Sequence, residues 1–354
     1  MPTNFSNNKQ LLKNLFAGPF PGNAILINPP GSSVLYPGDF TLSDRPVKDY
    51  FSFYESDYEN AVKWHAELGD DSVPYINFNT NTGIFAAAFG CKLHEHEGSL
   101  ASARPLITTV EEADALPQAD ISARTINRVF EIASALRDRM GDDIPISVPD
   151  IQSPFDIAAL IWNKADMFVA LLDNPDAVHR LIEKCYNLLE SFLKEYQRIL
   201  PSVNMCHCPY AWAPRGLGCW LSEDEVGSMS SRMFDEFCLP TLTRLSIAFG
   251  GLFLHCCASA DHQYGGFKKI PNLRGLNRVF QSPGPGPAIK AFAGTTVHMV
   301  AWTDETAVLN MLKMAEPDSR FLFNMENTDI NLAKAMLERI RNADKREKES
   351  VKTL

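Results

Sequence analysis

A histidine and a cysteine stand two positions apart in the apolar run Leu254-His255-Cys256-Cys257. In a β-strand, alternate side chains share a face, so His255 and Cys257 would point the same way and Cys256 the other. Imidazole nitrogen and thiolate sulfur are donors that zinc prefers, and a catalytic zinc site keeps one coordination position open. The pair therefore predicts a zinc site, unless both side chains merely pack at the end of a strand.

Two protein donors do not complete such a site, so a third ligand is expected from elsewhere in the chain. The candidates are Cys206, Cys208, Cys219 and Glu326. Cys206 and Cys208 would share one face of a preceding strand, although a cysteine pair of this kind also serves as core packing. Cys185 and Cys238 fall within apolar helical patterns and are expected to be core residues.

The elements that would position these residues alternate along the chain. Eight β-rich runs are separated mostly by helical patterns, at residues 24–28, 73–78, 144–148, 203–208, 251–257, 276–281, 295–300 and 320–325. This alternation predicts a single (β/α)8 barrel over residues 1–354, with an N-terminal extension (1–23) and a charged tail (343–354). The alternative is an open doubly wound sheet, whose glycine-rich phosphate-binding turn is missing after the first run.

In a (β/α)8 barrel the active site lies at the carboxyl ends of the strands. Asp150 and His298 are the candidate acid–base residues, although Asp150 could instead cap a helix and His298 could be structural. The expected substrate-binding residues are Asn28, Asn77, Gln152, Trp220 and Gln281. His94 and His96 have the spacing of a metal pair, but a solvated surface strand explains them better.

Composition narrows the class of partner. The 354 residues carry 33 basic and 43 acidic side chains, a net charge of −10, with no basic stripe, which argues against nucleic acid. No apolar run approaches the roughly 20 residues of a membrane helix, and the N-terminal residues lack an apolar signal core. We therefore expect a cytoplasmic protein, without a membrane partner, whose eight cysteines are unpaired.

Several segments together resemble the uroporphyrinogen decarboxylase superfamily, from about residue 58 to residue 335. They are Gln152-Ser-Pro-Phe-Asp-Ile-Ala158, Leu172-Asp-Asn-Pro-Asp-Ala-Val178, Leu221-Ser222, Phe237-Cys-Leu-Pro240 and Gly250-Gly-Leu-Phe-Leu-His-Cys-Cys257, with Asp70-Asp71, Val73-Pro74 and Phe89-Gly-Cys91 typical of uncharacterised bacterial members. The resemblance implies a (β/α)8 barrel, in agreement with the strand count. It also implies one of two chemistries.

Uroporphyrinogen decarboxylases carry an arginine-rich motif after the first strand, which grips the substrate carboxylates. Here that place reads Asn28-Pro-Pro-Gly-Ser-Ser33 and has no arginine, the residue best suited to pairing with carboxylates. A decarboxylase of a tetrapyrrole or another carboxylated substrate remains the alternative. It would be favoured if Arg104, Arg215, Arg274 and Arg278 lined the barrel mouth. A second alternative is a non-catalytic corrinoid or porphyrin binder.

The other branch contains zinc methyltransferases that move a methyl group between a corrinoid protein and a thiol. Their zinc ligands resemble His255-x-Cys257 together with a later cysteine near the final strand. Residues 321–327 contain no cysteine here, so Glu326, Cys208 or Cys219 would have to complete the site. The favoured prediction is a zinc-dependent methyltransferase that uses a methylcobamide and a zinc-activated small-molecule thiol, with a corrinoid protein docking over the barrel mouth.

Overall fold

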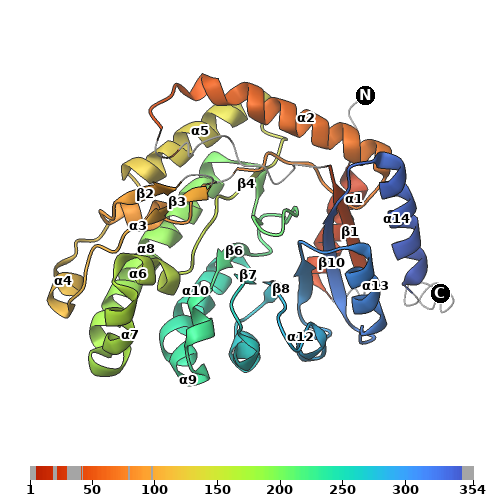
Figure 1. The fold of residues 1–354 in the computed structure, drawn as a ribbon. Helices are drawn as coiled ribbons and strands as arrows, with labels where there is room; N and C mark the ends of the chain where they lie inside the picture. Colours follow the sequence, from red (N-terminus) through yellow and green to blue (C-terminus); the bar gives the residue numbers. More distant parts are fainter. Residues whose placement is uncertain are drawn as a thin grey trace.

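A parallel sheet forms the centre of the computed structural model, which describes residues 5–18, 22–29, 41, 43–78, 80–96 and 99–344 (Figure 1). Six strands lie in the order β1-β10-β9-β8-β7-β6, and every neighbouring pair is parallel. Their bounds are β1 Gly22–Asn28, β6 Cys219–Ser222, β7 Leu252–Cys256, β8 Leu273–Arg278, β9 Val297–Val300 and β10 Arg320–Glu326.

Shorter parallel contacts continue this series beyond β6. Gln152 pairs with Ser222 of β6, and β4 (Ile146–Ser147) pairs with Ile76 on one side and with β5 (Val203–Asn204) on the other. The segment before Ile76 reaches β1, because the Asp71 N–H donates to the Ile25 carbonyl at 3.0 Å. The order of neighbours thus returns to β1, as in a barrel and unlike an open doubly wound sheet. The predicted (β/α)8 class is confirmed.

The predicted strands differ from the observed ones where the runs are short. Residues 73–78 contribute a single bridge, and the run 203–208 narrows to the two residues of β5. Strand β6 was not predicted, because Cys219-Trp220 reads as part of a loop. The surface strand expected at His94 and His96 is confirmed as β2 (Leu93–His96), in which His94 is exposed and the side chain of His96 lies outside the described residues. Its antiparallel partner β3 (Ser99–Ala103) was not predicted.

Helices surround the strands in Figure 1. The longer ones are α1 Ser6–Ala17, α2 Phe51–Leu68, α5 Arg124–Met140, α6 Pro154–Ile161, α7 Lys164–Asp173, α8 Pro175–Ile199, α10 Leu239–Phe249, α13 Glu305–Lys313 and α14 Ile330–Ala343. Shorter helices are α3 Ile84–Ala88, α4 Val110–Ala115, α9 Ser231–Met233, α11 Tyr264–Phe267 and α12 Gly286–Phe292, with single turns at Val47–Tyr50, Glu225–Ser228 and Asp261–Gln263. None of these helices is both long and apolar enough to cross a membrane.

Local sequence rules explain several helix boundaries. Ser153 caps α6 by accepting a hydrogen bond from the Asp156 N–H at 3.0 Å, and Pro154 takes the first helical position. The apolar helical pattern that contains Cys238 is divided by a π-helical turn, Phe234–Cys238, just before Pro240, which has no N–H for the regular ladder. Cys185 and Cys238 are completely buried, as predicted for core residues.

Candidate metal centre

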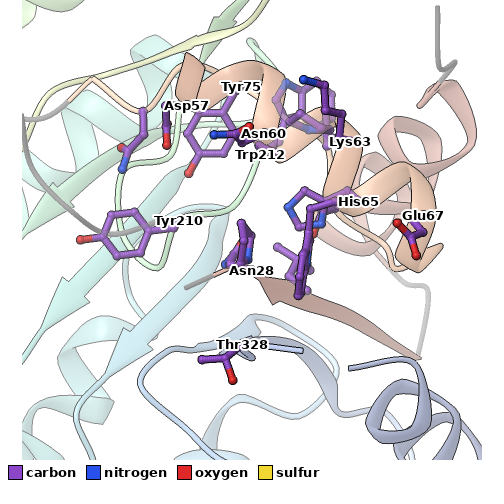
Figure 2. A pocket seen from close by; sticks show the side chains of 18 residues that line it. Asn28, Asp57, Asn60, Lys63, His65, Glu67, Tyr75, Tyr210, Trp212 and Thr328 are labelled. Carbon is purple, nitrogen blue, oxygen red and sulfur yellow. The ribbon is translucent and has the colours of Figure 1, made fainter. Parts of the chain in front are cut away.

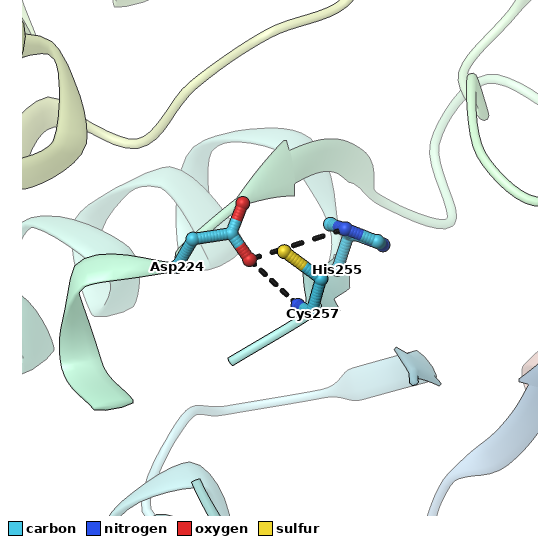
Figure 3. A group of neighbouring side chains, drawn as sticks. All are labelled: Asp224, His255 and Cys257. Atoms are coloured by element: carbon cyan, nitrogen blue, oxygen red, sulfur yellow. Dashed lines mark hydrogen bonds and ion pairs between the residues drawn. The ribbon is translucent and has the colours of Figure 1, made fainter. Parts of the chain in front are cut away.

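Asp224, His255 and Cys257 meet at the carboxyl ends of β6 and β7 (Figure 3). The strand register brings them together: Ser222 of β6 lies beside His255, so the residue two positions further on, Asp224, lies level with Cys257. One oxygen, one ring nitrogen and the sulfur all lie within 4.8 Å of one another. His255 Nε2 is 3.9 Å from Asp224 Oδ1, which also accepts the Cys257 N–H at 2.6 Å.

Asn277 of β8 fixes the orientation of the His255 ring. Its Nδ2 donates to the Met299 carbonyl at 2.5 Å, so its Oδ1 must face the imidazole, 2.6 Å from His255 Nδ1. An amide oxygen only accepts, so Nδ1 carries the proton and Nε2 presents its lone pair. A histidine ligand held through its other nitrogen by a polar partner is the common arrangement at metal sites.

The three donors fit a zinc ion. Carboxylate oxygen, imidazole nitrogen and thiolate sulfur all coordinate zinc, and three protein ligands leave one position for a substrate. Cys257 is exposed, so that position is open to solvent. Partial burial, together with the hydrogen bond to Asp224 and its negative charge, raises the pKa of the Cys257 thiol to about 12. A divalent cation would reverse that effect, because it favours the thiolate.

The third member of this group is not one that the sequence predicted. Glu326 is exposed at the end of β10, which β8 and β9 separate from β7, so the structure does not bring it into the group. Cys208 lies close by but outside the group, its thiol 3.5 Å from Asn277 Oδ1. Cys206 and Cys219 are completely buried. Asp224 was missed because its strand was missed, although the acidic run Glu223-Asp224-Glu225 ends that strand.

A buried carboxylate anchors the loop that carries Asp224. Asp156 of α6 accepts the N–H groups of Asp224 at 2.7 Å and Glu225 at 3.2 Å. Next to it, the side chain of Glu223 is completely buried. Burial raises the pKa of Glu223 to about 8, and burial together with Glu223 raises the pKa of Asp156. The backbone of the loop after β6 is therefore fixed by its hydrogen bonds to the Asp156 side chain.

Asp150 lies near enough to Asp224 for the charge of Asp224 to act on it. Burial, and then the negative charge of Asp224, raise the pKa of Asp150 to about 7, while the Gln152 amide donates to it at 3.4 Å. A carboxyl group that titrates near neutral pH suits the acid–base role predicted for it. Trp220 lies beneath the site: its ring centroid is 6.1 Å from that of His255, and its Nε1 donates to the Cys208 carbonyl at 2.7 Å.

A cavity of about 510 Å³ opens beside this site, between α2 and the ends of β1 and the segment 72–78 (Figure 2). Asn28 and Asn77, both predicted to bind substrate, line it together with Tyr75 and Tyr210. The pKa of the Tyr75 phenol is raised well above its usual range by burial, and further by groups that include Tyr210 and Cys208. Tyr210 of this lining is two residues from Cys208, which contacts Asn277, the residue that orients His255.

Other predicted site residues lie elsewhere. The His298 ring is completely buried between Phe292 of α12 and Phe321 of β10, with centroid distances of 6.2 and 5.5 Å, and burial lowers its pKa to about 4. His298 therefore belongs to the packing between sheet and helix, which corrects the catalytic role predicted for it. Gln281 is exposed, three residues past the end of β8, and does not line the cavity.

The four arginines that would favour a decarboxylase also lie away from the cavity. Arg274 donates to the Ala17 carbonyl at the opposite end of the strands, and Arg215 donates to the Gln197 carbonyl. Arg104 contacts His94 in the hairpin, and Arg278 pairs with Asp261 at 3.2 Å. Among the residues that the structure describes, the cavity has no arginine in its lining.

Known proteins with a similar sequence profile or a similar structure support the fold described above. Residues 77–198 match the sequence profile of the family described as uroporphyrinogen decarboxylase (URO-D). Among solved structures, a methyltransferase from Methanosarcina mazei superposes with a TM-score of 0.63 at 12% sequence identity, covering 95% of this chain and 98% of that one. No curated protein matches the sequence. The resemblance to the uroporphyrinogen decarboxylase superfamily is thus confirmed over residues 77–198, and the match to the methyltransferase concerns the fold.

Proposed function

We propose that this protein is a zinc-dependent methyltransferase of the uroporphyrinogen decarboxylase superfamily, which moves a methyl group between a corrinoid (methylcobamide) and a thiol. The observation that carries the proposal is the group Asp224, His255 and Cys257, in which Asn277 leaves the Nε2 lone pair of His255 free. If these side chains served only to pack the ends of the strands, there would be no reason for an oxygen, a nitrogen and a sulfur donor to meet there.

The three side chains would hold the metal through one carboxylate oxygen, Nε2 and Sγ. When bound, zinc supplies the positive charge that keeps a coordinated acceptor thiol ionised at neutral pH. Asp150, with its pKa of about 7, is the group placed to take the proton that the thiol loses. The thiolate sulfur then forms the bond to the methyl group, and the corrinoid keeps the electron pair of the broken carbon–cobalt bond.

The charges around the site support this reading over porphyrinogen decarboxylation. A polycarboxylate substrate needs cationic side chains, but the mouth carries Asp150, Asp224 and, at its rim, Glu326. The open side of Cys257 is where a thiol and the methyl carrier would approach. A corrinoid protein, the partner that the family resemblance implies, would dock over this mouth.

The test is a zinc determination on protein purified under reducing conditions, for wild type, Cys257→Ser and Cys256→Ser. We expect about one zinc per chain in wild type, as three protein ligands imply, and its loss in Cys257→Ser. The control should keep the metal, because Cys256 points away from the group and contacts Arg278 at 3.2 Å. Demethylation of methylcobalamin by 2-mercaptoethanol, followed by absorbance, then tests the reaction. A metal-free wild type would overturn the proposal.

A further inference from the structure

The cavity beside α2 contains a carboxylate that lacks a counterion. Asp57 lies on α2, lines this cavity, and also lines a second hollow further along the same helix. It is half-buried, and no described side chain forms a hydrogen bond or an ion pair with it. Burial raises the pKa of Asp57 above its ordinary value, as expected for a carboxylate without a neighbouring positive charge.

The other charged groups of the lining are already neutralised. Lys63 and Glu67 point to solvent, with side chains 74% and 60% exposed, and they pair with Glu59 and Lys334. His65 is buried, and its Nδ1 lies 3.1 Å from the carboxylate of Asp70. Arg45 lines the second hollow with Asp57 but does not line the cavity, whose described lining has no arginine. Asp57 therefore leaves the cavity with one negative charge that no described side chain pairs with.

Aromatic rings surround this carboxylate. Figure 2 shows Asp57 beside Tyr75, with Tyr210 on the same side of the cavity, and Trp212 is part of the same lining. The pKa shift of Tyr75 includes a contribution from the charge of Asp57, which agrees with their closeness. Lys9 lies 5.9 Å from the Trp212 ring centroid, and Trp64, which also lines the cavity, donates its Nε1–H to the Ile27 carbonyl at 2.6 Å. Among these four rings, Tyr75 is the one whose closeness to Asp57 is established, and Tyr210 lies on the same side of the cavity.

A carboxylate among aromatic rings selects a particular ligand chemistry. The faces of aromatic rings attract cations, most strongly in a desolvated pocket, and the carboxylate supplies the balancing charge. An anion would meet Asp57 without a compensating arginine. We propose that the cavity binds a small organic ammonium cation, with Asp57 as its counterion and Tyr75 and Tyr210 as its aromatic walls. This site does not require a metal at Asp224, His255 and Cys257.

Calorimetric titration of the full-length, metal-free protein with choline and with its uncharged isostere 3,3-dimethyl-1-butanol tests the proposal. The two probes share shape and hydroxyl group and differ in charge. We expect wild type to bind choline at least about tenfold more tightly than the alcohol. Asp57→Asn keeps the shape of the side chain and should abolish that preference.

The matched control is Glu55→Gln, which removes one charge from the same helix at a residue that pairs with Arg139 and does not line the cavity. It should keep the preference of wild type for choline. Equal affinity of wild type for the two probes, no binding of choline, or an unchanged preference in Asp57→Asn would each overturn the proposal. None of these outcomes bears on zinc binding, which the Cys257→Ser experiment measures separately.

Discussion

Replacing Asn277 by leucine removes the group that orients His255 without touching any of the three donors. Three hydrogen bonds disappear. His255 Nδ1–H donates to Asn277 Oδ1 at 2.6 Å, the Cys208 thiol donates to the same oxygen at 3.5 Å, and Asn277 Nδ2 donates to the Met299 carbonyl at 2.5 Å. Asn277 is almost completely buried, so water does not readily replace any of these partners. The imidazole can then rotate or place its proton on Nε2, the nitrogen that must bind the metal.

The expected effect has two parts that can be measured separately. Loss of a second-layer partner of a metal-bound histidine weakens metal affinity about 10–100-fold, or about 1.4–2.8 kcal/mol. The orphaned Met299 carbonyl lowers the free energy of unfolding by about 1–3 kcal/mol. Competition with a chromophoric chelator gives the zinc affinity, and denaturant unfolding of the metal-free variant gives the stability.

Asn324→Leu is the matched control. Asn324 is also a buried amide at the carboxyl end of a strand, with one bond to the Tyr210 carbonyl and one to Asn28, and it does not contact His255. The Asn324→Leu variant should lose about as much unfolding free energy as Asn277→Leu, but its zinc affinity should stay within about twofold of that of wild type. The reasoning is refuted if both leucine variants bind zinc equally well, or if nitrogen NMR of the metal-free wild type finds the His255 proton on Nε2.

Three further predictions follow from the pKa shifts around the metal centre. Because the pKa of Cys257 is raised to about 12, zinc binding at pH 7 should release close to one proton from this thiol. The binding heat measured by calorimetry should then depend on the ionisation enthalpy of the buffer. A binding heat that is the same in all buffers would contradict thiolate coordination. Because Asp224 contributes to the raised pKa of Asp150, Asp224→Asn should lower the pKa of Asp150 below about 7 in a carbon NMR titration of metal-free protein. The pKa of Glu223 is raised to about 8, so its protonated form contributes stability at low pH that is lost as pH rises through that value. The free energy of unfolding of Glu223→Gln, relative to that of wild type, should therefore increase by at least about 1 kcal/mol between pH 5 and pH 8.5. A constant difference in unfolding free energy across that range would show that Glu223 does not titrate there.

The barrel was predictable because its best-paired strands are apolar runs long enough to recognise. β1, β7 and β10 are five to seven residues long, have three or four successive apolar residues, and are buried at nearly every position. β6 was not recognisable, since Cys219–Ser222 is only four residues long and contains no β-branched residue. Missing β6 also removed Asp224 from the set of strand-end residues, although the acidic run after Leu221-Ser222 was visible.

The wrong assignments depended on geometry that one sequence does not contain. Whether His298 faces the barrel mouth or the helices is a matter of strand register, and a shift of one residue reverses the answer. Glu326 was expected to complete the metal site from its place near the final strand, but the strand order puts two strands between β10 and β7. His255 and Cys257 needed only the alternation of side chains along one strand, which explains why that prediction agrees with the observed geometry.

Asp156 illustrates how a local motif can serve a distant site. Its position after Ser153 and Pro154 predicts a capping-box residue whose side chain turns back to the start of its own helix. In the structure the backbone N–H of Asp156 donates to the Ser153 hydroxyl, while the carboxylate of Asp156 accepts the N–H groups of Asp224 and Glu225 instead. A carboxylate this deeply buried is costly unless N–H groups satisfy it, so α6 and the loop after β6 stabilise each other. The side chain of Asp224 is thereby left free to face His255 and Cys257, because the backbone that carries it is already fixed.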